Sequence, residues 1–296
     1  MTRPESPILV IGREGQLARA LAAVGHSNVL SIGRPEADLA DAQKLAALMA
    51  RYTPRLVLNA GGFTKVDPAE TQPSHAFALN RDGPATLAGL CEGQGIPLIH
   101  ISTDCVFGGE SPEPYSPDDE PRPLSVYGRS KLAGEDAVAA HCSRHLIVRV
   151  SWVFSEHADN FVPMMLRLAR ARQDVTVVDD QVGYPTYCPD LAEGLLLMAE
   201  TALRPGFAAW GTYHLAGRQE TNRAAMAQAI FAESRALGGP AARVNPVATA
   251  DYGAPAARPL NARLNSAKAE AVFGIVLPDW YPGLQKSVRV LLSETN

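Results

Sequence analysis

The sequence predicts an α/β protein built on a doubly wound parallel sheet, with a smaller, mostly helical second unit. Through the first half of the chain, short aliphatic runs alternate with segments of helical periodicity. Strands that are apolar along their whole length are typical of a parallel sheet covered by helices on both faces. Beyond about residue 155 the pattern loosens into helices separated by Pro- and Gly-containing turns. We therefore expect one unit over 1–154 and another over 155–296, with a blurred boundary where the chain crosses back.

The expected elements alternate in a regular order. Runs such as "PILVIG" and "RLVLNAG" predict strands, and apolar residues three or four apart, as in "DAQKLAALMARY", predict helices. The strands are expected at 7–12, 28–33, 55–61, 97–103 and 145–154, and the helical segments at 16–25, 41–52, 74–94, 127–142, 161–172, 189–203 and 222–237. The first helix is expected to stop at Gly25. A Pro- and acid-rich stretch at 108–123 predicts a long surface loop.

Composition narrows the classes of function. The chain has 296 residues, 46% of them hydrophobic and 20% charged, with a net charge of −4, which does not favour nucleic acid or a lipid surface as a partner. No apolar run reaches the roughly 18–20 residues of a membrane span, and the N-terminal run lacks the features of a signal peptide. No CxxC pair occurs among Cys91, Cys105, Cys142 and Cys188, which predicts reduced thiols and a cytoplasmic location.

A glycine-containing turn, "GREGQLA", follows the first strand and opens the first helix, with Gly12, Gly15 and Ala18 in a G-x-x-G-x-x-A pattern. Such a turn lets a phosphate approach the free N–H groups of the helix, although an ordinary turn is an equal alternative. Arg34 stands after the second strand, where a ribose 2′-OH would favour an acid. Its guanidinium suits a 2′-phosphate, which favours NADP over NAD, unless Arg34 is only a surface residue. Asp38 is expected to reach the adenine or to cap the next helix.

Two further strand ends carry candidate residues. The segment "NAGGFTKVD" contains small residues that let a chain pass close to a cofactor, or it is simply a Gly-rich turn. The segment "HISTDCVFGG" places Ser102, Thr103 and Asp104 at the end of the fourth strand. A hydroxyl at that place can hydrogen-bond a substrate oxygen or, alternatively, cap a turn.

The segment "VYGRSKLAGE" places Tyr127 and Lys131 four residues apart, on one face of a helix. We expect Lys131 to stabilise a phenolate and so to lower the pKa of Tyr127 from its usual value of about 10. A tyrosine of this kind can donate a proton to a developing alkoxide, and the lysine can hold a cofactor ribose. The pair alone is a weak signal, but together with Thr103 and the glycine turn it favours a reductase site.

Taken together, these residues resemble the extended short-chain dehydrogenase/reductase superfamily, whose catalytic triad matches Thr103, Tyr127 and Lys131. Motifs in both halves, including "STDCVF", "RVSWVF", "DDQVGYPT" and "RPLNARLN", resemble the dTDP-4-dehydrorhamnose reductases over nearly the whole chain. The resemblance implies a Rossmann-type fold with a C-terminal substrate-binding unit. It also implies reduction of the 4-keto group of a dTDP-4-keto-6-deoxy sugar, dTDP-4-dehydro-β-L-rhamnose, by NADPH or NADH to give dTDP-L-rhamnose.

The resemblance implies a role for each part of the site. Tyr127 would be the general acid, Lys131 would bind the nicotinamide ribose, and Thr103 would hold the substrate oxygen. The predicted cofactor site comprises Gly12, Glu14, Gly15, Gln16, Leu17, Arg34, Asp38, Leu39, Gly61, Gly62, Thr64, Tyr127 and Lys131. The predicted substrate site comprises Val66, Thr103, Asp104, Trp152, Arg258 and Arg263, with the two arginines expected at the diphosphate.

Departures from the family pattern keep alternatives open. Many members have a tyrosine at the position of Cys105 and alanines at Gly61 and Gly62. A nucleotide-sugar epimerase or dehydratase of the same superfamily is one alternative, although Ala18 and Arg34 favour it less. A non-enzymatic NADP-binding regulatory subunit is another, although the triad is intact. Some members use magnesium for dimerisation, but no carboxylate cluster can be assigned to a metal, so the metal and a homodimer stay open.

Overall fold

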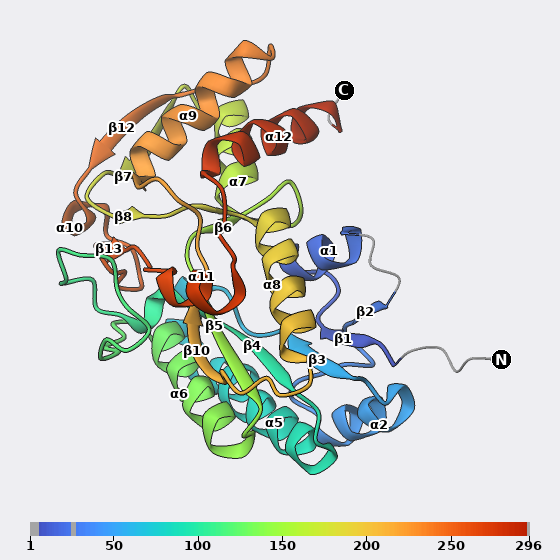
Figure 1. The fold of residues 1–296 in the computed structure, drawn as a ribbon. Helices are drawn as coiled ribbons and strands as arrows, with labels where there is room; N and C mark the ends of the chain where they lie inside the picture. Colours follow the sequence, from blue (N-terminus) through green and yellow to red (C-terminus); the bar gives the residue numbers. More distant parts are fainter. Residues whose placement is uncertain (1–5, 25–27, 295–296) are drawn as a thin grey trace.

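The computed structural model describes residues 6–24 and 28–294, so Gly25, the expected end of the first helix, lies outside the described residues. Its centre is a six-stranded, all-parallel sheet in the order β10-β5-β4-β3-β1-β2 (Figure 1). The strands are β1 (Ile8–Ile11), β2 (Val29–Ile32), β3 (Leu56–Asn59), β4 (Leu98–Thr103), β5 (His145–Val150) and β10 (Gly211–His214). The strand order reverses between β1 and β3, because β2 is added on one side of β1 and β3 on the other, and ligands bind at this point in folds of this kind. The predicted fold class is confirmed.

Helices bury both faces of this sheet, because alternate strand residues point to opposite sides. Ile8 and Val10 of β1 join a core with α1 (Gln16–Ala23) and α8 (Cys188–Ala202). Leu9 and Ile11 face the other core, which is formed with α2 (Ala42–Tyr52), α5 (Gly83–Gln94) and α6 (Val126–His141). Both α8 and β10 come from the second half of the sequence but pack on the six-stranded sheet (Figure 1).

The remaining helices form at the expected places. The segment 74–94 is helical throughout, as α4 (Pro73–Phe77), a π-helical turn η1 (Ala78–Asp82) and α5; α7 (Phe161–Ala171) and α9 (Arg223–Ala236) also match the prediction. The helical elements that were not predicted are α3 (Val66–Thr71), the 3₁₀ turn η2 (Asp104–Val106), α10 (Thr249–Tyr252), α11 (Ala267–Phe273) and α12 (Trp280–Ser293). Helices α7, α9 and α12 enclose a separate core with residues such as Phe154, Phe231 and Trp280.

The second unit also contains short strands that the sequence did not reveal. The parallel pair β7 (Asp174–Val178) and β12 (Arg243–Val247) flanks the separate core. A three-stranded sheet has the order β11-β8-β13, formed by β11 (Thr221–Asn222), β8 (Val182–Gly183) and β13 (Asn261–Ala262). These strands are short and pair over long sequence separations, so local periodicity gives little sign of them.

The expected fifth strand at 145–154 is wrong in its second half. β5 ends at Val150, and Trp152 adopts a left-handed backbone conformation with φ 45°. The hydroxyl of Ser151 donates to the Ala262 carbonyl at 2.8 Å and to Asp104 Oδ2 at 2.9 Å, which holds the chain as it leaves the sheet. The next residues form β6 (Val153–Phe154), which pairs with β9 (Thr186–Tyr187) in the second unit.

The segment 108–123 is a loop, as predicted, but it is anchored to the body of the protein. Tyr115 stacks on Phe107 with ring centroids 4.1 Å apart, and its backbone N–H donates to the Arg263 carbonyl at 2.9 Å. Aromatic stacking and burial of this kind hold the middle of the loop. None of the helices in the described ranges is long and apolar enough to cross a membrane.

Candidate active site

Two glycines set how closely α6 approaches its neighbours. A Cβ atom on Gly128 would overlap the carbonyl oxygen of Cys105, and one on Gly134 would overlap that of Asn80. The helix begins at Ser125, whose hydroxyl accepts a hydrogen bond from the Gly128 N–H at 3.1 Å. The "YGRSKLAGE" segment therefore carries its glycines for packing, and this packing brings the tyrosine–lysine pair to the end of β4.

Tyr127 is buried and faces a cavity beside Thr103. Burial raises the pKa of Tyr127 well above its usual value, and Cys105 adds to the rise, whereas the Thr103 hydroxyl lowers it. The prediction that Lys131 lowers the pKa of Tyr127 is wrong for this structure, because Lys131 Nζ donates to the Ile101 carbonyl at 2.6 Å. Spacing on a helix placed the two side chains on one face but did not report the burial of the phenol, which is the largest cause of the raised pKa of Tyr127. Tyr127 is thus held as a neutral phenol, which is a proton donor.

Lys131 lies among buried polar groups. Burial lowers the pKa of Lys131 to about 8, while Glu135, one turn further along α6, opposes the change. Its Nζ lies 3.4 Å from Nε2 of His100, and Nδ1 of that ring lies 3.1 Å from the Asn59 amide nitrogen. Burial also lowers the pKa of His100 well below its usual value, so the imidazole is neutral.

A buried ion pair fixes α6 to β5 behind the catalytic residues. Arg149 Nη2 lies 2.7 Å from Glu135 Oε2, and both side chains are almost completely buried. Ser102, a candidate from the end of β4, also donates its hydroxyl to Glu135. Because removing one partner would leave a buried charge uncompensated, the pair constrains the position of α6 strongly. Ser102 also lines the smaller cavity, but its hydroxyl is engaged by Glu135.

Asp104 organises the hydroxyl groups at the end of β4. Thr103 Oγ1 donates to Asp104 Oδ1 at 2.8 Å, and Ser151 Oγ donates to Oδ2 at 2.9 Å. Burial raises the pKa of Asp104, and the bonds from Thr103 and Ser151 and the charge of Arg223 oppose this rise. A hydroxyl hydrogen can rotate between acceptors, so Thr103 can turn from Asp104 toward a ligand oxygen.

The turn after β5 contributes Trp152, and the start of α9 contributes Arg223, an arginine that was not predicted. The guanidinium of Arg223 lies 3.6 Å above the Trp152 ring and 5.1 Å from that of Phe161. A Cβ atom on Gly183 would press against the Trp152 indole, so β8 packs closely on that side chain. Burial lowers the pKa of Arg223 to about 10, and Asp104 opposes this change. A single arginine at the start of a helix belongs to no motif, so no local pattern indicated Arg223.

The two predicted diphosphate arginines lie in different places. Arg258 lines the cavity, and its Nη2 lies 2.9 Å from Asp67 Oδ2 of α3. Arg263 instead donates from Nη1 to Glu220 Oε2 at 2.6 Å and from Nη2 to the Pro112 carbonyl, beneath the 108–123 loop. The structure therefore brings Arg258, but not Arg263, to the predicted site.

Two adjoining cavities hold the other predicted residues. A cavity of about 430 Å³ is lined by Gly15, Gln16, Leu17, Gly61, Gly62, Thr64, Val66, Thr103, Asp104, Tyr127, Lys131, Trp152 and Arg258. A larger one of about 960 Å³ is lined by Gly12, Glu14, Gly15, Arg34, Asp38, Leu39, Gly61, Gly62 and Thr64. The cavities share lining residues at the end of β3 and at the glycine turn, so together they form one cleft along the ends of the strands.

The glycine turn has the features of a phosphate cradle. Gly12 has φ 125°, a conformation that favours glycine. Gly15 caps α1 without a side-chain hydrogen bond, and a Cβ atom there would meet nothing within 4 Å. The first N–H groups of α1 therefore lack a side-chain cap, which suits an anion. Nearby, among the described residues, the exposed guanidinium of Arg34 makes no hydrogen bond or ion pair.

Two predicted residues near this turn have local partners. Glu14 lies 2.9 Å from Arg19 Nη2 and 3.5 Å from Arg13 Nε in ion pairs. Asp38 Oδ1 accepts from the Ala40 N–H at 3.0 Å, so this side chain stabilises a turn at the rim of the larger cavity. The cap of α2 is Asp41, not Asp38.

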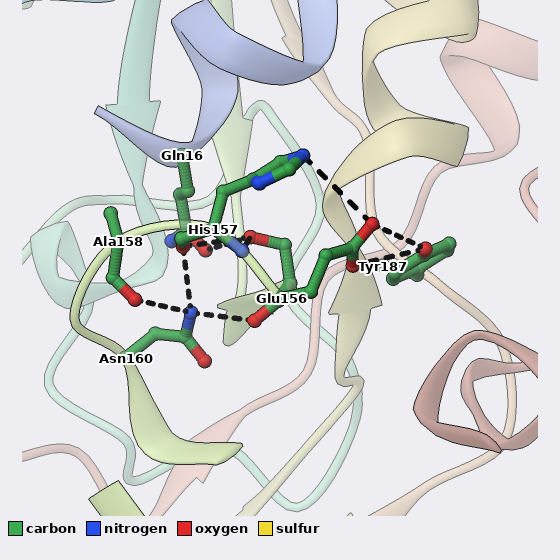
Figure 2. Close-up of polar contacts among 7 residues, drawn as sticks. Gln16, Glu156, His157, Ala158, Asn160 and Tyr187 are labelled. Atoms are coloured by element: carbon green, nitrogen blue, oxygen red, sulfur yellow. Dashed lines mark hydrogen bonds and ion pairs between the residues drawn. The ribbon is translucent and has the colours of Figure 1, made fainter. Parts of the chain in front are cut away.

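Gln16 ties the glycine turn to the loop 155–160 (Figure 2). Its Nε2 donates to the Val153 carbonyl at 3.2 Å, and Ser155 Oγ lies 3.2 Å from its Oε1. Figure 2 shows the Asn160 amide pointing into the same loop, where it donates to the carbonyls of Ser155, His157 and Ala158. Ala158 lines the smaller cavity. The side chain of Gln16 thus positions the loop 155–160 at the edge of the cleft. The backbone N–H of Gln16 can donate to a phosphate.

Asn80 is a further cavity residue that the sequence did not reveal. Its side chain accepts from the Phe63 N–H at 2.8 Å and donates to the Phe63 carbonyl at 3.0 Å and to Ser130 Oγ at 2.9 Å. A Cβ atom on Gly62 would lie 2.8 Å from Asn80 Oδ1. Asn80 thereby clamps the turn after β3 against α6, and Gly62 leaves it the necessary room.

Comparisons with known proteins agree on one family. The family described as "RmlD substrate binding domain" matches residues 6–293. The chain is 41% identical to a dTDP-4-dehydrorhamnose reductase of Sinorhizobium fredii, over 97% of the chain and 98% of that protein, and 37% identical to one of Escherichia coli, over 97% and 99%. A crystal structure of dTDP-4-dehydrorhamnose reductase from Bacillus anthracis, in complex with NADP, superimposes with a TM-score of 0.89 at 29% identity, covering 97% of this chain and all of that one.

Proposed function

The chain belongs to the dTDP-4-dehydrorhamnose reductase family, and we propose that it reduces the 4-keto group of dTDP-4-dehydro-β-L-rhamnose to give dTDP-L-rhamnose, with NADPH as the reductant. The observation that carries this proposal is the meeting of Thr103, Tyr127 and Lys131 in one cleft between a glycine turn and a cationic wall. A proton donor, a hydrogen-bonding hydroxyl and a buried lysine are the groups that reduction of a carbonyl requires.

The larger cavity fits a dinucleotide. Gly12 and Gly15 leave backbone N–H groups of α1 open to a diphosphate, and Arg34 supplies an unpaired cation at the rim for a 2′-phosphate. Gly61, Gly62 and Thr64 line the passage from this cavity into the smaller one, which contains Lys131. When bound there, NADPH would supply the hydride. NADH is compatible with the same cradle, because NADH and NADPH differ only in the 2′-phosphate that Arg34 would bind.

The residues of β4 and α6 handle the proton. Tyr127 is a neutral phenol, so its Oη can donate a proton to the sugar oxygen as negative charge develops on that oxygen. Thr103 can rotate its hydroxyl from Asp104 to the same oxygen and hold it in place. Lys131, which lines the same cavity, would bind the nicotinamide ribose. Holding these groups on a buried sheet and helix limits the reorganisation that the reaction requires.

The second unit would hold the nucleotide-sugar. Arg223 and Arg258 both line the smaller cavity, and together they present positive charge to a diphosphate. We therefore replace Arg263, which is paired with Glu220, by Arg223 in the proposed substrate site. The indole of Trp152 can cover the apolar face of the sugar ring. Val66 lines the cavity from α3 and Cys105 from η2.

A cytoplasmic location and a homodimer also remain part of the proposal. The four cysteines are free thiols, which suits a reducing compartment. Within the ranges 6–24 and 28–294, no group of three or more His, Cys, Asp or Glu side chains is arranged to hold a metal ion.

The proposal is tested by incubating the purified chain with dTDP-4-keto-6-deoxy-L-mannose and NADPH, or NADH in parallel, while following the absorbance of the reduced nicotinamide. We expect the absorbance to fall and dTDP-L-rhamnose to form. Omission of the sugar should stop both changes. The proposal would be wrong if neither cofactor were oxidised although the folded protein binds both ligands.

A further inference from the structure

A row of buried polar side chains leads from β3 to the catalytic lysine. Asn59 is the last residue of β3, and His100 is its directly paired neighbour in β4. Both are completely buried. The Asn59 amide nitrogen lies 3.1 Å from His100 Nδ1, and His100 Nε2 lies 3.4 Å from Lys131 Nζ on α6. Three elements thus contribute one side chain each to a continuous polar path that ends at Nζ.

The hydrogen bond of Asn59 to the backbone fixes the direction of this path. Oδ1 of Asn59 accepts from the Gly61 N–H at 3.1 Å. A backbone N–H can only donate, so the amide oxygen must face Gly61 and the amide nitrogen must face His100. Nδ1 of His100 is then an acceptor without a hydrogen. Because burial keeps the imidazole neutral, its single N–H hydrogen lies on Nε2, the atom that faces Lys131.

This tautomer presents a donor to the lysine. An ammonium group has three N–H donors and no acceptor, so the Nε2–H of His100 has nothing to donate to while Lys131 is charged. The neutral amine has a lone pair that can accept from Nε2–H and still donate to the Ile101 carbonyl, 2.6 Å from Nζ. The opposite tautomer of His100 would instead offer a lone pair to the ammonium. The row of side chains therefore disfavours the charged lysine relative to the amine.

The other groups around Nζ do not reverse this preference. Glu135 favours the ammonium but is already held by Arg149 of β5 and by the Ser102 hydroxyl of β4. Tyr127, one turn earlier on α6, is a neutral phenol. On the η2 side, Asp104 is occupied by the hydroxyls of Thr103 and Ser151.

We propose that Asn59 and His100 are positioning residues that set the pH at which Lys131 loses its proton, because they direct Nε2–H of the imidazole at Nζ. The proposal rests on the proposed function, since that function gives Lys131 its role in turnover. The protonated lysine is present below its pKa and is lost as the pH rises through it. Burial already lowers the pKa of Lys131 to about 8. We therefore expect turnover to fall as the pH rises through that region, with the His100 N–H favouring the amine in addition to burial.

The tautomer is measured directly by ¹⁵N NMR of the full chain labelled at histidine. His100 and His214 are both buried, and burial lowers the pKa of each, so their rings should not titrate near neutral pH. His214 faces the Tyr115 carbonyl with Nδ1, 3.0 Å away, and so must carry its hydrogen there. We expect the reverse for His100, with the hydrogen on Nε2. The signals are told apart by the His214→Gln variant. A hydrogen on His100 Nδ1, or a charged ring at neutral pH, would overturn the proposal.

The pH dependence of turnover supplies the second test. In His100→Gln, a side-chain amide oxygen can accept from Nζ and stabilise the ammonium, so the alkaline limb should move up by about one to two pH units. His214→Gln is the matched control, because it replaces another buried imidazole without touching Nζ, and its limb should stay in place. If turnover of His100→Gln and of His214→Gln fell at the same alkaline pH, the proposal would be contradicted. If the unchanged protein shows no turnover, the proposed function fails, and the NMR measurement still decides the tautomer.

Discussion

The two walls of the cleft are held in different ways. The wall made by β4, η2 and α6 is set by backbone packing, since Gly128 and Gly134 bring helix and neighbouring carbonyls together without intervening side chains. The opposite wall presents Trp152, Arg223 and Arg258 from a turn, a helix start and a loop, fixed by side-chain contacts such as the guanidinium over the indole. The first wall thus holds the reacting groups through backbone packing, and the second presents its cations and its indole through side-chain contacts.

The largest expected effect falls on the first wall. In Tyr127→Phe the proton donor is lost, so kcat should fall by about 10²–10⁴ while NADPH affinity stays nearly the same. Tyr187→Phe is the matched control, because Tyr187 is also buried and hydrogen-bonds Glu156 outside the catalytic group. Steady-state rates with a deuterated nicotinamide would confirm that chemistry limits turnover. Wild-type kcat in Tyr127→Phe under those conditions would exclude Tyr127 as the acid.

The second wall should show its effect in substrate binding. Arg223→Ala removes a cation from the cavity, so KM for the dTDP-sugar should rise about 10–100-fold, the usual range for a charged hydrogen bond, with a smaller change in kcat. Arg263→Ala is the control, since that side chain pairs with Glu220. A larger rise in KM for Arg263→Ala than for Arg223→Ala would return Arg263 to the substrate site.

The packing of α6 is tested by a glycine substitution. A methyl group in Gly134→Ala would meet the Asn80 carbonyl, so we expect a loss of about 1–3 kcal/mol in the free energy of unfolding. Gly89 of α5 is exposed and has nothing within 4 Å of a Cβ position, so Gly89→Ala should be stabilising by roughly 0.5–1 kcal/mol. Denaturant unfolding measures both changes. If Gly134→Ala and Gly89→Ala changed the free energy of unfolding equally, the close approach of α6 to the Asn80 carbonyl would not contribute to stability.

The smallest effect is expected away from both walls, at the exposed rim of the larger cavity. Arg34→Ala should weaken NADPH binding about tenfold and leave NADH binding nearly unchanged, because only NADPH carries the 2′-phosphate and an exposed charge pair contributes about 1 kcal/mol. Arg51→Ala removes another exposed arginine of the same unit as a control. Fluorescence titration gives both dissociation constants. Equal losses for the two cofactors would show that Arg34 does not recognise the phosphate.

The same contrast explains what the sequence could predict. Tyr127 and Lys131 lie four residues apart on a regular helix, so spacing predicted that they share a face, and Thr103 was a candidate because it ends a predicted strand. Arg223 and Asn80 reach the cavity only through tertiary packing, from the start of α9 and from a π-helical turn, and no local pattern marks them. The pKa of Tyr127 was predicted in the wrong direction because spacing does not report burial or where Nζ turns. Arg263 has the right residue type but is taken by Glu220.

The most direct test of the central claim follows the hydride from the nicotinamide ring to the sugar. The chain would be given dTDP-4-keto-6-deoxy-L-mannose with NADPH deuterated on one or the other face of nicotinamide C4, and the sugar product would be analysed by mass spectrometry and NMR. The account predicts that one of the two labelled cofactors delivers deuterium to C4 of the rhamnosyl ring. A nucleotide-sugar product without deuterium, or with deuterium at another carbon, would contradict it.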